Sequence, residues 1–200
     1  MNGRSLACLL VAAVLAVGLL TALHGVLAPR QQVAAEASAE RALLDLLPAG
    51  SYDNHPLQDA VPLTGADDLG SPSPATAWRA RQGERLVAVL LPVRARGYEG
   101  PIDLLLAIAP DGRLLYSKVL AYRETPGIGD RIEASRSPWL GSLAGRNLAE
   151  QPGEWRVRAD GGDVDQIAGA TITSRAVVAG VQAGLRYFDA HRDALLGATP

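Results

Sequence analysis

Residues 85–122 read RLVAVLLPVRARGYEGPIDLLLAIAPDGRLLYSKVLAY, and this stretch decides the fold. Its apolar runs, with one that precedes it, span 76–81, 85–93, 101–109 and 113–122. Pro110, Asp111 and Gly112 separate the last two runs and suit a tight hairpin. Apolar runs of this length joined by short turns predict strands that pair antiparallel.

The strongest helical signal follows near the C-terminus. Between residues 173 and 190, helical spacing places Val177, Val178, Val181, Leu185 and Phe188 on one face. Weaker patterns predict a short helix over 137–144 and brief strands over 154–158 and 163–167. Strands paired by short turns, with helices around them, predict an α+β domain with an antiparallel sheet and flanking helices.

The N-terminal segment has a different character. From Ser5 to Pro29 there is no Asp, Glu, Lys or Arg. A membrane span needs about 20 apolar residues, so residues 1–30 predict a single transmembrane anchor with a short cytoplasmic tail. The alternative is a cleaved signal peptide, because small residues such as Ala22 and Ala28 lie near the end of the run. A short tail before a long domain favours a domain on the periplasmic side of a bacterial inner membrane, although the flanking charges are nearly balanced.

Two regions connect this anchor to the main domain, which is expected at 76–200. Residues 31–47 predict a helix that ends at Pro48 and Gly50. Residues 51–75 are rich in Pro, Asp, Gly and Ser without a clear period, so a linker or surface loop is predicted there. The region 31–75 is therefore expected to be a helix followed by a linker.

Composition excludes several classes of function. The chain has 19 basic and 21 acidic residues and no basic run, so nucleic-acid binding is not expected. The single cysteine, Cys8, lies in the apolar N-terminal run, which leaves the rest of the chain without ligands for an iron–sulfur cluster or a c-type haem. The three histidines show no metal-ligand spacing, so no metal site is expected. Redox chemistry in the soluble part would require an organic cofactor.

The segment 165–174, DQIAGATITS, places hydroxyl groups where a helix begins. Gly169 permits a tight backbone turn, and Thr171, Thr173 and Ser174 follow it. A helix N-terminus offers unpaired N–H groups and partial positive charge, which suit an anionic phosphate. The simpler interpretation is that these residues only cap the helix.

The segment 124–130, ETPGIGD, combines a turn with two glycines. Pro126 followed by Gly127 suits a type II turn, because proline presets its φ and glycine adopts a positive φ. Glycines also let backbone approach a flat ring closely. Taken alone, the segment indicates a turn, with or without a binding role.

Together these motifs resemble a known family. In the order GYEGPIDLLLAI, ETPGIGD and DQIAGAT, they are similar to the FMN-binding G subunit of the Rnf (Rsx) ion-translocating electron transport complex, to which the C subunit of the sodium-pumping NADH:quinone reductase is related. Asp165, Gly169, Ala170 and Thr171 match the motif at which a flavin transferase uses FAD to attach FMN to the threonine through a phosphoester bond. The motif usually has Ser or Thr where this chain has Ala168.

The resemblance implies a set of site residues. Thr171 would be the covalent FMN acceptor, and the other cofactor-binding residues would be Ala170, Gly169, Thr173, Glu124, Thr125, Gly127 and Asp165. Asp165 would serve recognition by the transferase or order the turn, and the alternative for it is a solvated carboxylate. Trp139 and Tyr98 would pack on the flavin or belong to the core, while Asp130 and Glu133 would lie at the flavin mouth or simply be exposed.

The function that the resemblance implies is an electron-carrier subunit of a membrane-bound, ion-translocating complex working with the ferredoxin/NAD couple. The chain would have no complete active site of its own, no resident metal and no nucleic-acid partner. Its partners would be the other subunits of the complex and, during maturation, the flavin transferase. Two alternatives stay open: a flavin-bearing regulatory domain, and a secreted binding module without flavin.

Overall fold

The computed structural model describes residues 45–70, 75–149 and 155–197, all within one compact unit, Leu44–Pro200. The predicted anchor at 1–30, and the predicted helix at 31–47 up to residue 44, lie outside these residues. Within the described ranges, no helix is both long enough and apolar enough to cross a membrane.

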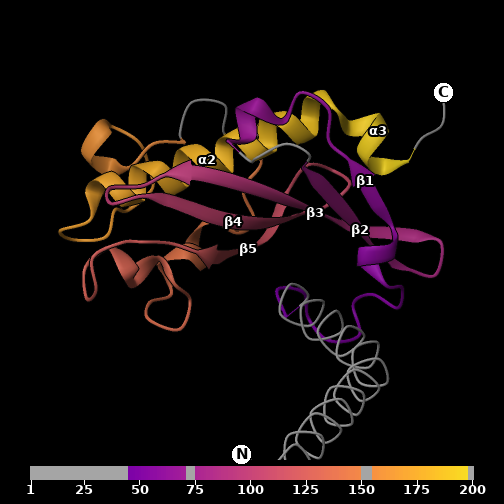
Figure 1. The fold of residues 1–200 in the computed structure, drawn as a ribbon, viewed down its shortest axis with the longest axis horizontal. Helices are drawn as coiled ribbons and strands as arrows, with labels where there is room; N and C mark the ends of the chain where they lie inside the picture. Colours follow the sequence, from indigo (N-terminus) through magenta and orange to yellow (C-terminus); the bar gives the residue numbers. More distant parts are fainter. Residues whose placement is uncertain (1–44, 71–74, 150–154, 198–200) are drawn as a thin grey trace, which may run out of the picture. The chain divides into compact units, whose positions relative to one another are not determined.

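An antiparallel sheet forms the centre of the domain (Figure 1). In the described part of the chain it has five strands in sequence order, which are β1 (Ala60–Pro62), β2 (Thr76–Gln82), β3 (Arg85–Arg96), β4 (Pro101–Ile108) and β5 (Leu114–Ala121). Each strand pairs antiparallel with the next. Strands β2 to β5 coincide with the four apolar runs, so the predicted antiparallel sheet is confirmed.

The hairpin between β4 and β5 also follows the prediction. The Gly112 N–H donates to Ala109 O at 2.9 Å, and the Ala109 N–H donates to Arg113 O at 2.8 Å. Gly112 has a φ of +90°, in the left-handed region that glycine adopts without steric cost. The short turn therefore sets the register in which β5 pairs with β4.

The region predicted as a linker or surface loop, 51–75, instead contributes to the sheet. Its described residues form two short 3₁₀ helices, η1 (Pro56–Gln58) and η2 (Ala66–Leu69), with the edge strand β1 between them. Leu69 is fully buried and Val61 nearly so. A strand of three residues is too short to show a period-2 pattern, which is why the sequence did not reveal it.

Helix α2 (Thr171–Ala190) covers one face of the sheet (Figure 1), and the short helix α3 (Arg192–Leu196) follows it. All five residues predicted to form its apolar face are buried. They share one hydrophobic cluster with inward side chains of the central strands, among them Val89, Leu91, Val93, Leu104 and Leu106. The helix thus packs mainly on β3, and also on η2 and β4, and burial of this apolar surface stabilises the fold.

Between β5 and α2 the chain forms the short 3₁₀ helices η3 (Gly129–Ile132), η4 (Trp139–Leu143) and η5 (Arg158–Asp160). The helix predicted over 137–144 is present as η4. The strands predicted over 154–158 and 163–167 were wrong, apart from one parallel bridge between Val157 and Val164. The loop inserts Trp155, Val157, Val164 and Ile167 into the core, and this alternation imitates the period of a strand.

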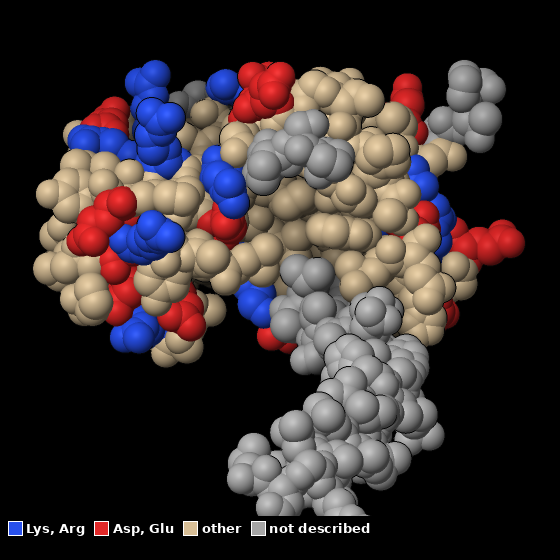
Figure 2. All heavy atoms as spheres, viewed as in Figure 1, with Lys and Arg blue, Asp and Glu red and all other residues tan. Residues whose placement is uncertain are grey.

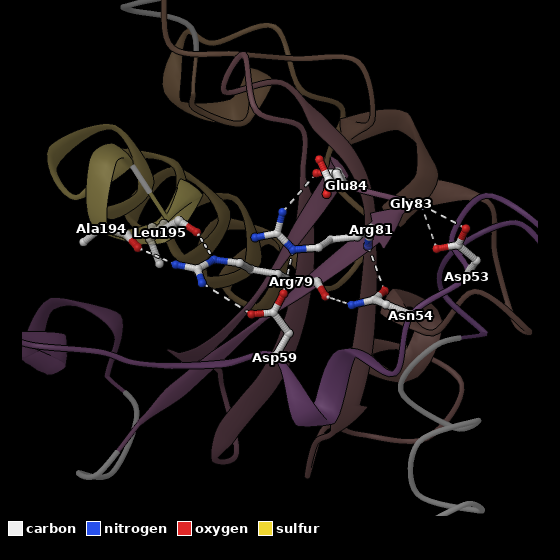
Figure 3. Close-up of polar contacts among 9 residues, drawn as sticks. All are labelled: Asp53, Asn54, Asp59, Arg79, Arg81, Gly83, Glu84, Ala194 and Leu195. Carbon is white, nitrogen blue, oxygen red and sulfur yellow. Dashed lines mark hydrogen bonds and ion pairs between the residues drawn. The ribbon is translucent and has the colours of Figure 1, made fainter. Parts of the chain in front are cut away.

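Arg79 on β2 joins the sheet to the end of α3 (Figure 3). Its Nε donates to Leu195 O at 2.6 Å, and a terminal nitrogen donates to Ala194 O at 2.7 Å. Asp59 accepts from the guanidinium groups of both Arg79 and Arg81. Arg79 therefore satisfies carbonyls at the negative end of a helix, where a cation is favoured.

Charged side chains are unevenly distributed over the face drawn in Figure 2. Blue and red side chains lie side by side over the loops between β5 and α2, on the left, whereas the middle of the face is mostly uncharged. The loop charges form ion pairs, such as Arg136–Asp130 at 3.0 Å within the loops and Asp160 with Arg175 of α2 at 2.6 Å. Opposite charges therefore hold together a region with little regular secondary structure.

Candidate functional site

A cavity of about 450 Å³ opens where the β3–β4 hairpin, the loop after β5 and the start of α2 meet. It is lined by Tyr98, Glu124, Thr125, Ile128, Gly129, Gly169, Ala170, Thr171, Ile172 and Thr173. Its volume falls in the range of about 300–1,000 Å³ that is usual for cofactor sites. The two segments singled out in the sequence, 124–130 and 165–174, therefore lie on the same cavity.

Two similar turns build the walls. In the first, the Ile128 N–H donates to Thr125 O at 3.2 Å, and Gly127 in the third position has a φ of +78°. In the second, the Ala170 N–H donates to Ile167 O at 3.0 Å, and Gly169 has a φ of +82°. A positive φ at the third position is the mark of a type II turn, so the turn predicted at Pro126–Gly127 is confirmed.

Helix α2 begins directly at the cavity. Ala170 is its N-cap residue, no side chain caps it, and the first bond of the helix runs from the Ser174 N–H to Ala170 O at 2.9 Å. The amides of Thr171, Ile172 and Thr173 are therefore open toward a ligand. The Thr171 side chain is half-buried and lines the cavity, and its hydroxyl bonds to no residue that the structure describes.

The other two hydroxyls of this turn are committed elsewhere. Thr173 is buried, and its Oγ1 donates to Glu124 Oε2 at 2.5 Å. The Ser174 Oγ accepts from the Ile167 N–H and donates to Ala170 O, both at 3.0 Å. The interpretation of these residues as simple caps is therefore wrong, because neither hydroxyl accepts a hydrogen bond from the open amides at the start of the helix.

Glu124 lies in the cavity wall with only 5 % of its surface exposed. Besides the bond from Thr173, its Oε1 accepts from the backbone N–H groups of Tyr98 at 3.0 Å and Glu99 at 3.3 Å. One carboxylate thus connects the β3–β4 hairpin, the loop after β5 and the first turn of α2. Both of its oxygens are already engaged by protein donors.

The structure separates the remaining predicted site residues into two groups. Thr125, Gly169 and Ala170 line the cavity, and the Thr125 hydroxyl donates to Glu99. Gly127 forms the turn but does not line the cavity. The Asp165 carboxylate is 73 % exposed and pairs with Arg158 at 2.8 Å, away from the cavity lining.

The residues with weaker predictions also divide. Tyr98 lines the cavity and is 65 % exposed, whereas Trp139 does not line it and donates from its indole nitrogen to Asp165 O at 2.5 Å. Asp130 is buried beside Arg136 and does not line the cavity. Glu133 likewise lies outside the lining and accepts a 2.9 Å bond from the Tyr122 hydroxyl.

The hydrogen bond between Tyr122 and Glu133 contributes to a shifted pKa in both side chains. The hydrogen bond from Tyr122 is the main reason why the pKa of Glu133 lies below its ordinary value. Burial, and then the bond to Glu133, raise the pKa of Tyr122. The pair therefore stabilises the loop beside the cavity while Glu133 is ionised and Tyr122 is protonated.

Three lining residues are absent from the predicted set of site residues, although they lie in the two segments singled out in the sequence: Ile128, Gly129 and Ile172. Ile128 is 45 % exposed and Ile172 is 49 % exposed, which is unusual for large apolar side chains. With Tyr98 they form an apolar rim around the cavity. Two features of the sequence could have identified these isoleucines. Ile172 lies on the polar side of the α2 pattern, and Ile128 lies between two glycines in a turn.

Comparison with known proteins matches this region. The family model of the FMN-binding domain matches residues 97–186, a range that contains every lining residue of the cavity. The G subunit of the ion-translocating oxidoreductase complex of Pseudomonas aeruginosa is 50% identical over 81% of this chain and 78% of the relative. Its counterpart in Cereibacter sphaeroides is 40% identical over 86% of this chain and 78% of the relative. The counterpart in Vibrio cholerae is 36% identical over 97% of this chain and 92% of the relative.

The chain belongs to the family of G subunits of ion-translocating oxidoreductase complexes. The resemblance indicated by its motifs is thereby confirmed, and so is an FMN-binding domain. Among solved structures, the crystal structure of Shewanella oneidensis NqrC is similar, with a TM-score of 0.48 and 24% identity over 70% of each chain. Because the match to the FMN-binding domain contains every lining residue, the cavity is the candidate flavin site of this family member.

Proposed function

We propose that FMN is bound covalently to Thr171 through a phosphoester bond and that the cavity holds its ring. The observation that carries this proposal is the hydroxyl of Thr171, which lines the cavity without a hydrogen bond to any described residue. Its neighbours Thr173 and Ser174 are buried and engaged. Of the three hydroxyls in this turn, that of Thr171 is the one available for modification.

A flavin transferase would catalyse the attachment by transferring the FMN part of FAD to Thr171. The Thr171 oxygen bonds to the FMN phosphorus of FAD, the bond between the two phosphates breaks, AMP leaves, and the hydroxyl proton passes to the transferase or to water. Neither oxidation nor reduction is involved. Asp165, exposed and outside the cavity, fits a role in recognition by that enzyme.

The residues of the cavity suit both ends of the cofactor. The phosphate would keep a negative charge, which the open amides of Thr171, Ile172 and Thr173 and the positive end of α2 favour by about 0.3–1 kcal/mol. Tyr98, Ile128 and Ile172 offer apolar surface for a flat ring. Gly129 contributes backbone to the wall and leaves room behind it for Glu124, because a Cβ there would lie 2.8 Å from Glu124 Cβ.

When bound, FMN supplies the ability to accept and release electrons, while the protein supplies position and electrostatics. Family membership and the FMN-binding domain support an electron-carrier subunit of an oxidoreductase complex. Its partners would be the other subunits of the complex. Those subunits would also bind the electron donor and acceptor of the ferredoxin/NAD couple. The apolar segment from Ser5 to Pro29 supports a single anchor in a bacterial inner membrane, with the described domain on the periplasmic side.

The test is to express the chain with an active flavin transferase and to run wild type, Thr171→Val and Thr173→Val on a denaturing gel under ultraviolet light. We expect a fluorescent band for wild type, a weaker but visible band for Thr173→Val, because that variant loosens the turn and keeps the acceptor, and none for Thr171→Val. A fluorescent Thr171→Val band would move the attachment to another residue. A dark wild-type band, with the transferase active on a second substrate, would rule out covalent FMN.

A further inference from the structure

We propose that Glu124 is a redox-tuning residue, whose carboxylate is held in the cavity wall as a fixed negative charge that keeps the reduction potential of the bound flavin low. This inference rests on the proposed binding of FMN in the cavity. It assigns to Glu124 a role different from that of a direct flavin ligand. Its oxygens face protein donors instead.

The hydrogen bonds hold the carboxylate in one place. Oε1 accepts from two backbone amides of the β3–β4 hairpin, and Oε2 accepts from Thr173 on α2. The three donors come from two different elements, so the side chain cannot turn without breaking contacts to one of them. All three neighbours act as donors, which suits the carboxylate as an acceptor on both of its oxygens.

Steric contacts close the remaining routes of movement. A Cβ at Gly97 would overlap Glu124 Oε1, and a Cβ at Gly129 would lie 2.8 Å from Glu124 Cβ and 3.0 Å from Oε2. The glycines on both sides therefore leave a slot that the glutamate side chain fills. Because Glu124 is buried and yet lines the cavity, its charge reaches the cavity with little water between.

The consequence for the flavin follows from charge. Two electrons and one proton add one negative charge to the ring, the electrons arriving from one carrier of the complex and leaving to the next. A fixed negative charge nearby opposes this change and favours the oxidised ring. An exposed carboxylate at the same distance has a smaller effect, since water and salt screen it.

Glu99 provides the matched control. It is exposed and belongs to the same site, because its carboxylate accepts from the Thr125 hydroxyl and its backbone N–H donates to Glu124. Glu99→Gln and Glu124→Gln remove one charge each without changing the shape of the side chain. Glu124→Met is a second uncharged variant that makes no hydrogen bond, so loss of charge and loss of the bonds can be compared.

The experiment is an anaerobic redox titration of each flavin-loaded protein against a reference dye at pH 7, after a thermal melt has shown that each variant is folded. We expect Glu124→Gln and Glu124→Met to shift the equilibrium toward reduced flavin by roughly tenfold, and Glu99→Gln by clearly less. Unchanged potentials in both Glu124 variants would overturn the proposal, as would an equal shift in Glu99→Gln. Wild type without covalent flavin would instead contradict the proposed function.

Discussion

Thr171 and Thr173 lie two residues apart in the first turn of α2, yet their hydroxyls lie in opposite environments. The Thr171 hydroxyl lines the cavity and bonds to no residue that the structure describes, whereas the buried Thr173 hydroxyl donates to Glu124 at 2.5 Å. The glutamate connects this turn to the β3–β4 hairpin. The bond of Thr173 thus fixes the turn that presents Thr171.

Thr173→Val should therefore destabilise the domain, and Thr171→Val should not. The first variant leaves a buried oxygen of Glu124 without its donor, which costs about 1–3 kcal/mol. The second removes a hydroxyl with no partner in the described structure, and we expect a change within about 0.5 kcal/mol. Urea unfolding of the two apoproteins measures both. Equal stabilities would show that the Thr173 bond contributes nothing.

Gly129→Ala tests the slot around Glu124. The added methyl group would lie 2.8 Å from Glu124 Cβ and 3.4 Å from Thr173 Oγ1, so it would press on the buried glutamate although Gly129 also lines the cavity. Overpacking of this kind costs about 1–3 kcal/mol. Gly141→Ala is the matched control, because nothing lies within 4 Å of its added Cβ. Chemical denaturation should separate the two variants, and a stable Gly129→Ala would mean that Glu124 is free to move.

Arg79→Met should loosen the contact between strand β2 and α3. Only 15 % of the Arg79 side chain is exposed, and its guanidinium donates to two carbonyls of α3 and to Asp59. Loss of these charge-assisted bonds should cost about 1.5–3 kcal/mol. Arg85→Met, at an exposed position on β3, should change stability by less than about 0.5 kcal/mol. Hydrogen exchange at residues 192–196 would localise the effect, and unchanged exchange there would argue against it.

The Tyr122–Glu133 pair predicts a specific pH dependence. The folded pKa of Glu133 lies below its ordinary value of 4.5, chiefly because Tyr122 donates to it. Its contribution to stability is therefore complete above pH 4.5 and is lost as the pH falls through the lower folded pKa. Tyr122→Phe should weaken this acid dependence, whereas Tyr116→Phe, at an exposed position of β5, should leave it unchanged. Acid unfolding followed by circular dichroism checks both, and identical acid limbs would contradict the role of the pair.

How far the sequence predicts this fold depends on the length of each pattern. Strands β2 to β5 and α2 carry runs long enough to show their periods, so they were identified correctly. β1 has three residues and no visible period, and Val157 and Val164 imitate a strand because a loop places them in the core. Local pattern cannot distinguish loop burial from sheet burial.

The site was predictable where its residues belong to a motif and not where a role depends on contacts distant in sequence. Glu124 was expected to touch the flavin, but its oxygens are engaged by Tyr98, Glu99 and Thr173, and Thr173 is 49 residues away in sequence. Ile172 lies within the segment 165–174, but nothing about its residue type marked it, and it is recognised only by its exposure at the rim. Tertiary contacts, not residue types, decide these roles.

Asp165 leads to the final prediction, which separates recognition from stability. Its carboxylate is 73 % exposed and pairs with Arg158, itself 65 % exposed, so the ion pair should contribute less than about 1 kcal/mol. Asp165→Asn should therefore fold as wild type does. If the transferase recognises the carboxylate, flavin incorporation should slow at least about tenfold, a loss typical of one charged contact of about 1.4 kcal/mol or more. Arg158→Ala removes the partner and keeps the carboxylate, so its loading should stay near the wild-type rate.

The measurement is the rate at which each folded apoprotein gains gel fluorescence with purified transferase and FAD. Equal slowing in both variants would assign the effect to the ion pair and the order of the loop, and an unchanged rate in Asp165→Asn would show that the transferase does not depend on this side chain.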